Sequence, residues 1–194
     1  MKLALALAIA VGLAVAPAAA QTQPATPPII YQPDPDSPIG ARNPRGAPGL
    51  AQFDFVIGDW DADITFRPPG RDPLNYRGRW HNSWIVDGFV VMQEWRGPYA
   101  TGAELRHYDP QTDTWSGFNV YVGQPFRTTT ARREGDTMIV LIEGNADQRG
   151  PFINRETYSD ITENSFHLRS ELSYDGGATW ERGRYELVAT RRSS

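Results

Sequence analysis

Short alternating segments dominate the chain after Gly49. No window of twelve residues there keeps helical periodicity; apolar and polar residues instead alternate over short runs bounded by Gly, Pro, Asn and Asp. We expect ten strands, over residues 60–66, 75–86, 89–95, 102–108, 114–121, 126–133, 137–143, 154–159, 165–173 and 179–190. Closing a meander of this length removes its exposed edges. The sequence therefore predicts an all-β fold, an antiparallel up-and-down β-barrel of about 8–10 strands with a short N-terminal helical turn.

The N-terminal quarter has a different composition and divides into two segments. Residues 1–20 combine Lys2, an apolar run and Ala18-Ala19-Ala20, which is the pattern of a secretory signal peptide cleaved after Ala20. Residues 21–49 hold eight prolines and little apolar periodicity, so we expect a disordered leader there. We assign residues 50–194 to a single barrel domain, and we expect an exported protein, periplasmic or extracellular, with no stable membrane insertion after cleavage.

Composition excludes several classes of chemistry. The chain has no cysteine, which rules out thiol nucleophiles, thiolate metal sites and stabilising disulfides. Lys2 is the only lysine and leaves with the signal peptide, so lysine Schiff-base catalysis is also excluded. The remaining 18 Arg against 23 Asp and Glu give a net charge of −5, which argues against nucleic acid as a partner.

The alternation within strands predicts an aromatic interior. Residues 76, 78, 80, 82, 84 and 86 share one strand face that combines tryptophan with asparagine, and the strand over 114–121 shows a similar mixture. A sealed core seldom combines tryptophan with amides, whereas a cavity with an aromatic wall and a few polar anchors does. We therefore expect a small apolar or aromatic molecule to be bound by Trp80, Asn82, Trp84, Glu94, Trp95, Trp115, Asn119 and Tyr121. Glu94 and Trp95 are neighbours, so both can face inward only if a bulge separates them.

The run F-D-F-V-I-G-D-W-D over residues 53–61 resembles the start of a family of exported bacterial proteins that begin F-D-F-W-I-G-x-W-D. Later landmarks are similar too: Asp87-Gly88 before Glu94-Trp95, and the ending S-Y-D-G-G-A-T-W over residues 173–180. The family is of uncharacterised function and is thought to be lipocalin-like. The resemblance therefore implies a calycin-type barrel and no particular activity. This chain has Val56 where the family usually has Trp.

Two local motifs carry structural expectations. Gly58-Asp59-Trp60 is similar to the G-x-W of lipocalins, in which a basic residue from the last strand packs over the tryptophan; Arg191 or Arg192 would fill that role here. Asp175, Gly177 and Trp180 fit the Asp-box pattern of sialidase propellers, which occurs here in a single copy. We interpret it as a structural hairpin in which the aspartate accepts backbone N–H groups. Asp87-Gly88 suits a two-residue type I′ turn.

The sequence contains no recognisable catalytic motif. No G-x-S-x-G is present, and His81, His107 and His167 lack metal-ligand spacing, so we expect neither a metal nor another cofactor. Glu94 is the best candidate among the strand carboxylates for an acid or base. Arg106, Arg155 and Arg169 lie on strands where an inward side chain could bind a ligand carboxylate, although an outward arginine is the commoner case.

Three functions stay open on these grounds. The first is an exported small-molecule-binding barrel with an aromatic-lined lumen. The second is a barrel enzyme, a lyase, isomerase or hydrolase, that uses an inward carboxylate such as Glu94. The third is a structural or partner-binding envelope protein with a filled barrel, acting through residues 21–49.

Overall fold

The computed structural model describes residues 39–193, so the expected signal peptide and most of the leader lie outside the described residues. One 3-10 helix, η1 (Pro48–Val56), precedes ten strands. The strands are β1 (Gly58–Phe66), β2 (Leu74–Ile85), β3 (Val90–Arg96), β4 (Thr101–Asp109), β5 (Thr114–Tyr121), β6 (Arg127–Glu134), β7 (Thr137–Asp147), β8 (Gly150–Ser159), β9 (Ser165–Ser173) and β10 (Glu181–Arg191).

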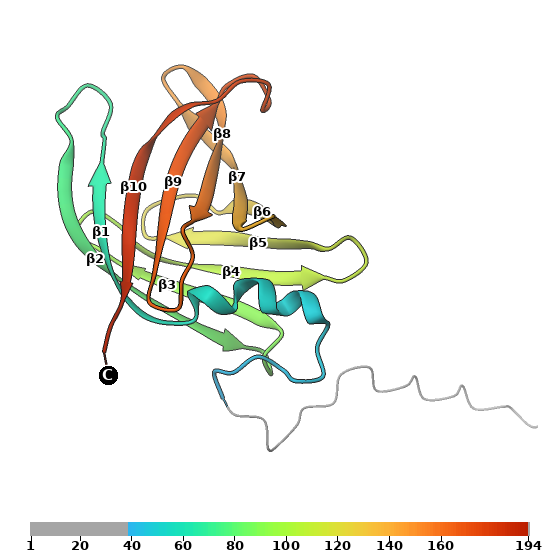
Figure 1. Ribbon diagram of the computed structural model, residues 1–194. Helices are drawn as coiled ribbons and strands as arrows, with labels where there is room; N and C mark the ends of the chain where they lie inside the picture. Colours follow the sequence, from blue (N-terminus) through green and yellow to red (C-terminus); the bar gives the residue numbers. More distant parts are fainter. Residues whose placement is uncertain (1–38, 194) are drawn as a thin grey trace, which may run out of the picture. The chain divides into compact units, whose positions relative to one another are not determined.

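The ten strands form one closed barrel in which each strand pairs antiparallel with its neighbours in sequence (Figure 1). Strand β1 closes the barrel by pairing with β10, from Trp60 opposite Arg191 to Phe66 opposite Tyr185. Closure leaves none of these strands with an unpaired edge. The predicted all-β, up-and-down barrel is confirmed, at the upper end of the expected strand number.

Helix η1 covers the end of the barrel where β1, β5 and β9 begin. Pro48 starts it at a position that needs no backbone donor, and Phe53 and Val56 are fully buried. Phe53 meets the Trp115 ring edge-on at 4.8 Å, and Phe55 meets Phe166 edge-on at 5.6 Å. The helix therefore seals this end of the barrel with aromatic side chains.

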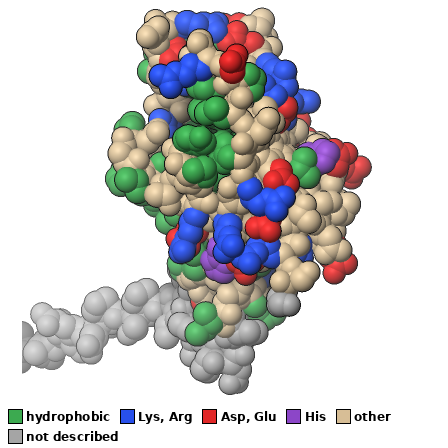
Figure 2. All heavy atoms as spheres, turned by 90° about the vertical axis from the view of Figure 1, so that its left-hand side faces the viewer, with side chains coloured by type: hydrophobic (Ala, Val, Ile, Leu, Met, Phe, Trp, Pro, Cys, Tyr) green, Lys and Arg blue, Asp and Glu red, His purple; other side chains and the backbone are tan. Residues whose placement is uncertain are grey.

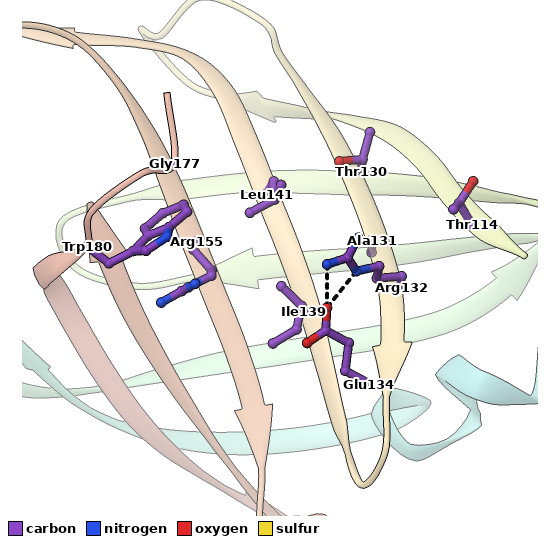
Figure 3. Close-up of a pocket in the computed structure, with 10 residues that line it drawn as sticks. All are labelled: Thr114, Thr130, Ala131, Arg132, Glu134, Ile139, Leu141, Arg155, Gly177 and Trp180. Atoms are coloured by element: carbon purple, nitrogen blue, oxygen red, sulfur yellow. Dashed lines mark hydrogen bonds and ion pairs between the residues drawn. The ribbon is translucent and has the colours of Figure 1, made fainter. Parts of the chain in front are cut away.

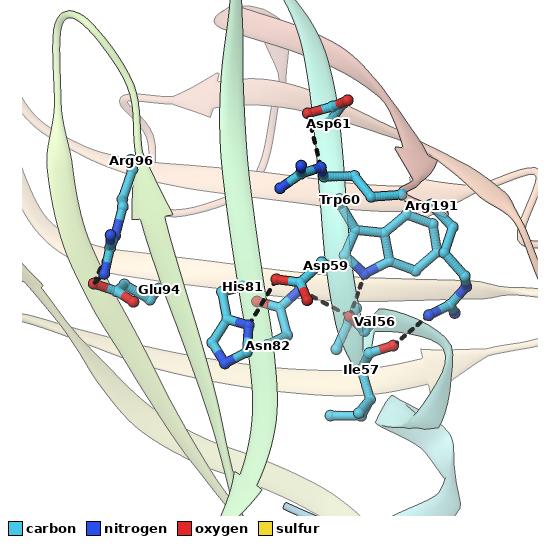
Figure 4. Close-up of polar contacts among 11 residues, drawn as sticks. Val56, Ile57, Asp59, Trp60, Asp61, His81, Asn82, Glu94, Arg96 and Arg191 are labelled. Carbon is cyan, nitrogen blue, oxygen red and sulfur yellow. Dashed lines mark hydrogen bonds and ion pairs between the residues drawn. The ribbon is translucent and has the colours of Figure 1, made fainter. Parts of the chain in front are cut away.

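The Gly58–Trp60 motif joins the helix to the first and last strands, as Figure 4 shows. Trp60 is fully buried, and its indole N–H donates to the carbonyl oxygen of Val56 at 2.6 Å. The Arg191 guanidinium lies 4.1 Å from the centre of the Trp60 ring and donates to the Ile57 carbonyl at 2.7 Å. Gly58 has φ +121°, and a β-carbon there would lie 2.4 Å from the guanidinium. The expected packing of Arg191 over Trp60 is thus present.

The folded part begins earlier than the sequence indicates. Trp84 donates its backbone N–H to the Gly40 carbonyl, and Asn43 donates its own to the Gly88 carbonyl at 3.1 Å. The Asn43 side chain is buried and donates to the Asp87 carbonyl at 2.9 Å. The end of the expected leader is therefore built into the structure, because its polar groups complete the hydrogen bonds of the β2–β3 connection.

That connection also differs from the predicted two-residue turn. Ile85 pairs with Val90, so four residues separate the strands. Val86, Asp87 and Gly88 all have positive φ, at 52°, 52° and 78°. The prediction of a two-residue turn was wrong. The longer loop presents the carbonyl groups of Asp87 and Gly88 to Asn43, which donates a hydrogen bond to each.

The single Asp-box forms the β9–β10 hairpin. The Asp175 carboxylate accepts the backbone N–H of Thr179 at 2.9 Å and the Thr179 hydroxyl at 2.6 Å. These bonds and one from Ser173 hold the pKa of Asp175 well below its usual range. Gly177, at φ +95°, makes the turn possible. The motif has the backbone-bonding geometry expected of a structural hairpin.

Candidate functional site

Strand alternation turns seven of the eight predicted binding residues into the barrel. Trp80, Asn82, Trp84, Trp95, Trp115 and Asn119 are buried, and Tyr121 is half-buried. The seven divide between two levels. Trp84 and Trp115 lie at the helix end with their rings 6.2 Å apart, and the Trp115 N–H donates to Gln52 of η1. Asn82 lies at the same end, because its side-chain amide donates to the Val56 carbonyl of η1 at 2.8 Å. These three residues belong to the plug of the barrel.

Glu94 is the eighth, and its placement in the interior was wrong. The register of β2 against β3 runs without a bulge from Arg79–Arg96 to Ile85–Val90, so Glu94 faces outward between the buried Gln93 and Trp95. Its carboxylate accepts two hydrogen bonds from the Arg96 side chain, at 2.8 and 3.0 Å (Figure 4). Glu94 therefore belongs to the surface.

The remaining aromatic residues form a wall above the plug. The ring of Trp80 meets that of Trp95 edge-on at 5.8 Å and lies stacked near Tyr158 at 6.3 Å. Tyr158 is fully buried. Tyr76 lies two inward positions further along β2, beyond Gly78, towards the barrel end away from η1, and is half-buried. This wall borders a layer of polar side chains.

The polar layer contains a buried ion pair that sequence reasoning did not single out as a site. Arg106 of β4 pairs with Glu104 on the same strand, with side chains only 1% and 6% exposed. Arg106 also donates to the Gln93 side-chain oxygen. Tyr121 donates to the other oxygen of Glu104 at 3.1 Å. Both charges are therefore paired and hydrogen-bonded inside the barrel, as buried charges must be.

Glu156 of β8 is a second carboxylate in this layer and has no cation of its own. It is 5% exposed, and one of its oxygens accepts from the Tyr185 hydroxyl at 2.5 Å. Asn154 in turn donates to that hydroxyl at 2.8 Å. Burial, followed by repulsion from Glu104, raises the pKa of Glu156 to about 7, although Tyr185 and Arg106 oppose the shift.

Eight inward-facing side chains each have a buried polar atom without a hydrogen-bond partner in the described part of the chain. They are Trp80 Nε1, Asn82 Oδ1, Gln93 Nε2, Arg106 Nε, Asn119 Oδ1, Asn154 Oδ1, Glu156 Oε2 and Tyr158 OH. A buried polar atom left unpaired costs about 1–3 kcal/mol. This concentration marks the polar layer as the part of the barrel interior with the most hydrogen-bonding groups left to satisfy.

Sequence reasoning missed this layer because β4 reverses the usual pattern. Glu104 and Arg106 point inward, whereas Ala103 and Leu105, which precede each of them, face out. Gly102 and Tyr108 lie on the same face of β4 as Glu104 and Arg106. The large aromatic side chain of Tyr108 was the sequence signal that this face points into the barrel. Of the other arginines considered, Arg155 faces out and pairs with Glu171 at 2.9 Å.

A groove lies on the outer face of the barrel, over β6, β7 and β8 (Figure 3). Its volume is about 450 Å³, and Arg155 lies 3.9 Å over the ring of Trp180 at one end. Arg132 and Glu134 form an ion pair within it. None of the predicted binding residues line this groove.

The surface carries mixed charge and scattered apolar side chains. Figure 2 shows hydrophobic side chains gathered in the middle of one face, with arginines and acidic residues around them. His81 and His167 are exposed and lie beside Asp59 and Asp160. Within residues 39–193, no group of three or more His, Asp or Glu side chains is arranged to hold a metal ion. No helix in that range is long and apolar enough to cross a membrane.

Comparisons with known proteins show little beyond distant likeness. No protein-family model and no curated protein match the chain. Among solved structures, it is similar to the crystal structure of Rv2717c from M. tuberculosis, with 11% identity, a TM-score of 0.48, and coverage of 76% of this chain and 99% of that chain. It is also similar to the structure of EF1p2_mFAP2b bound to DFHBI, with 11% identity, a TM-score of 0.29, and coverage of 75% and 100%. Likeness at this level carries no argument about function.

Proposed function

We propose that this protein is an exported barrel that binds a small molecule with an aromatic part, held between the Trp80–Trp95 wall and the polar layer. The observation that carries the proposal is the gathering of eight unpartnered buried polar atoms next to aromatic rings. Aromatic walls with a few convergent polar groups are typical of small-molecule sites. The signal-like sequence over residues 1–20 and the resemblance to lipocalin-like exported proteins support the same proposal.

The test is native mass spectrometry on the chain without residues 1–20, purified from its native host. We expect a bound molecule, retained by the wild type and lost or at least tenfold depleted in Trp80→Phe. That change removes an unpartnered indole N–H and part of the wall but keeps an aromatic ring. Trp180→Phe, on the outer face, is the matched control and should keep the molecule. Circular dichroism checks that both variants fold.

Other outcomes separate the alternatives. Loss of the molecule in Trp180→Phe alone would assign binding to the outer groove. A barrel that is empty by mass spectrometry and holds only ordered water in the polar layer would favour a filled barrel with a structural or partner-binding role. Deleting residues 21–38 then distinguishes that role, because only a partner-binding protein should lose its partner.

A barrel enzyme is the second candidate, with Glu156 in place of Glu94 as the inward carboxylate. Glu156 is 5% exposed, and burial and Glu104 raise its pKa to about 7. A general base works best when its pKa is near the working pH. Turnover of the co-purified molecule that disappears in Glu156→Gln would support this candidate; a molecule recovered chemically unchanged after long incubation would contradict it.

A further inference from the structure

On the outer face of β3, β4 and β5 the apolar side chains are contiguous rather than scattered. The strand register sets Met92, Leu105 and Phe118 side by side across the three strands. Phe126 of the β5–β6 loop lies against Phe118, with the two ring centres 6.4 Å apart. We call this surface the β5 patch; it consists of Met92, Leu105, Phe118, Val120, Val122 and Phe126.

The β5 patch is open to solvent. Its side chains on β5 and in the following loop are exposed by fractions that run from 37% for Val120 to 80% for Val122. The whole patch amounts to roughly 400–500 Å² of apolar surface, which is at the upper end of what a monomeric protein exposes in one place. Val188 of β10 gives the contrast, because it is 41% exposed but lies between Asp63 and His167 of the neighbouring strands.

The border of the patch is polar. On β3 the next outward residues after Met92 are Glu94 and Arg96, which form an ion pair at 2.8 Å. On β6 the outward residues are Thr128 and Thr130. An apolar centre with a polar rim is the usual anatomy of a protein–protein interface. A lipid surface instead attracts clusters of basic residues, whereas the β3 border sets one acidic residue beside one basic residue.

Area and charge both fit a second copy of this chain. A standard interface takes about 800 Å² from each partner, somewhat more than half of it apolar, and that apolar share matches the area of the β5 patch. In a two-fold pair both partners present the same surface, so charges are matched only where the border carries both signs. Glu94 and Arg96 meet this condition. Two sheet faces pack about 10 Å apart, which leaves room for the rings of Phe118 and Phe126 between them.

From these observations we infer that the protein forms a two-fold homodimer through the β5 patch. This inference goes beyond the proposed lumen site and does not depend on it. The patch side chains face outward, whereas Trp95 and Asn119 on the same strands are buried inside the barrel. The interior of each barrel is therefore the same in the monomer and in the dimer.

Analytical ultracentrifugation of the chain without residues 1–20 tests the inference. We expect reversible dimerisation with a Kd of about 1–100 μM. Phe118→Thr combined with Phe126→Thr should raise this Kd about a hundredfold, because it removes two exposed aromatic rings from the patch. Threonine suits an outward strand position, so the barrel should fold, which circular dichroism checks. Val188→Thr is the matched control and should dimerise like the wild type.

A crosslinking measurement keeps both aromatic rings in place. The chain has no cysteine, so Val120→Cys puts a single thiol in the β5 patch. With a short bismaleimide crosslinker we expect covalent dimers to form about tenfold faster than with Val188→Cys, because the two patches face each other at the spacing of packed sheets.

Three results would overturn the inference. The first is a wild type that stays monomeric at the highest concentration reached. The second is a dimer that is equally stable in the double phenylalanine variant, which would place the interface elsewhere on the barrel. The third is a monomer that sediments with phosphatidylglycerol vesicles and loses this property in the double variant, which would assign the patch to a lipid surface. The lumen proposal is judged separately, by the Trp80→Phe variant.

Discussion

At the scale of single residues, Glu156 makes stability depend on pH. Burial and Glu104 raise the pKa of this carboxyl from 4.5 to about 7 in the folded protein. A raised pKa means that Glu156 ionises less readily in the folded state than in the unfolded state. The contribution of neutral Glu156 to the free energy of unfolding is therefore fully present below pH 4.5 and is lost as the pH rises through 7. We predict that, from pH 5 to pH 8, the free energy of unfolding of the wild type falls by about 2–3 kcal/mol relative to that of Glu156→Gln.

Urea unfolding of both proteins at several pH values measures this difference. Glu94→Gln is the control, because its carboxylate lies on the outer face beside Arg96. A difference between wild type and Glu156→Gln that stays constant from pH 5 to pH 8 would contradict the prediction.

The same scale shows where sequence reasoning succeeded and where it could not. The inward orientation of Trp80, Asn82 and Trp84 is predictable from the sequence because the alternate positions are charged or polar. That of Glu104 and Arg106 is not, because a charged pair on one strand is usually exposed, and the additional partners that satisfy it inside the barrel, Gln93 and Tyr121, come from the neighbouring strands. Those partners lie more than ten residues away in sequence, so the polar layer can be recognised only when the pairing of β4 with β3 and β5 is known.

At the scale of elements, strand positions were predictable to within a few residues because turn residues mark the ends of each strand. The ordered structure of the segment before η1 was not predictable. Its prolines and polar residues are typical of disorder, yet Gly40 and Asn43 complete the β2–β3 connection. Asn43 is 1% exposed, which only the folded partner explains. A polar segment that is held by hydrogen bonds to a distant strand and loop carries no periodic signal of its own.

A truncation pair tests whether this segment belongs to the fold. A chain that begins at Pro48 should be less stable than one that begins at Ile39 by about 2–4 kcal/mol, because it loses two backbone hydrogen bonds and the bonds of the buried Asn43 side chain. Thermal and urea melts of the two chains give the value. Asn43→Ala in the longer chain should account for about 1–3 kcal/mol of it. Equal stability of the two chains would show that residues 39–47 only rest on the barrel.

At the scale of the whole molecule, the barrel has one sealed end and one irregular end. Helix η1 and its aromatic contacts close the first. The register shifts, between Ile142 and Asn145 of β7 and between Arg182 and Glu186 of β10, both lie at the second. Bulges interrupt a ladder and leave residues unpaired. Opening that admits a ligand to the polar layer should therefore start at the irregular end.

Amide hydrogen exchange tests this asymmetry directly. We predict that amides at 142–147 and 182–186 exchange at least tenfold faster than those at 60–64 and 187–190, where β1 and β10 pair without interruption. Saturation with a ligand of the polar layer should slow the first group, because the bound molecule links β4 and β8 across the interior, and should leave the second group unchanged. Uniform exchange along all ten strands would contradict the asymmetry. Protection gained only over β6 to β8 near Trp180 would instead place the ligand in the outer groove, since the lumen and that groove lie on opposite faces of the same strands.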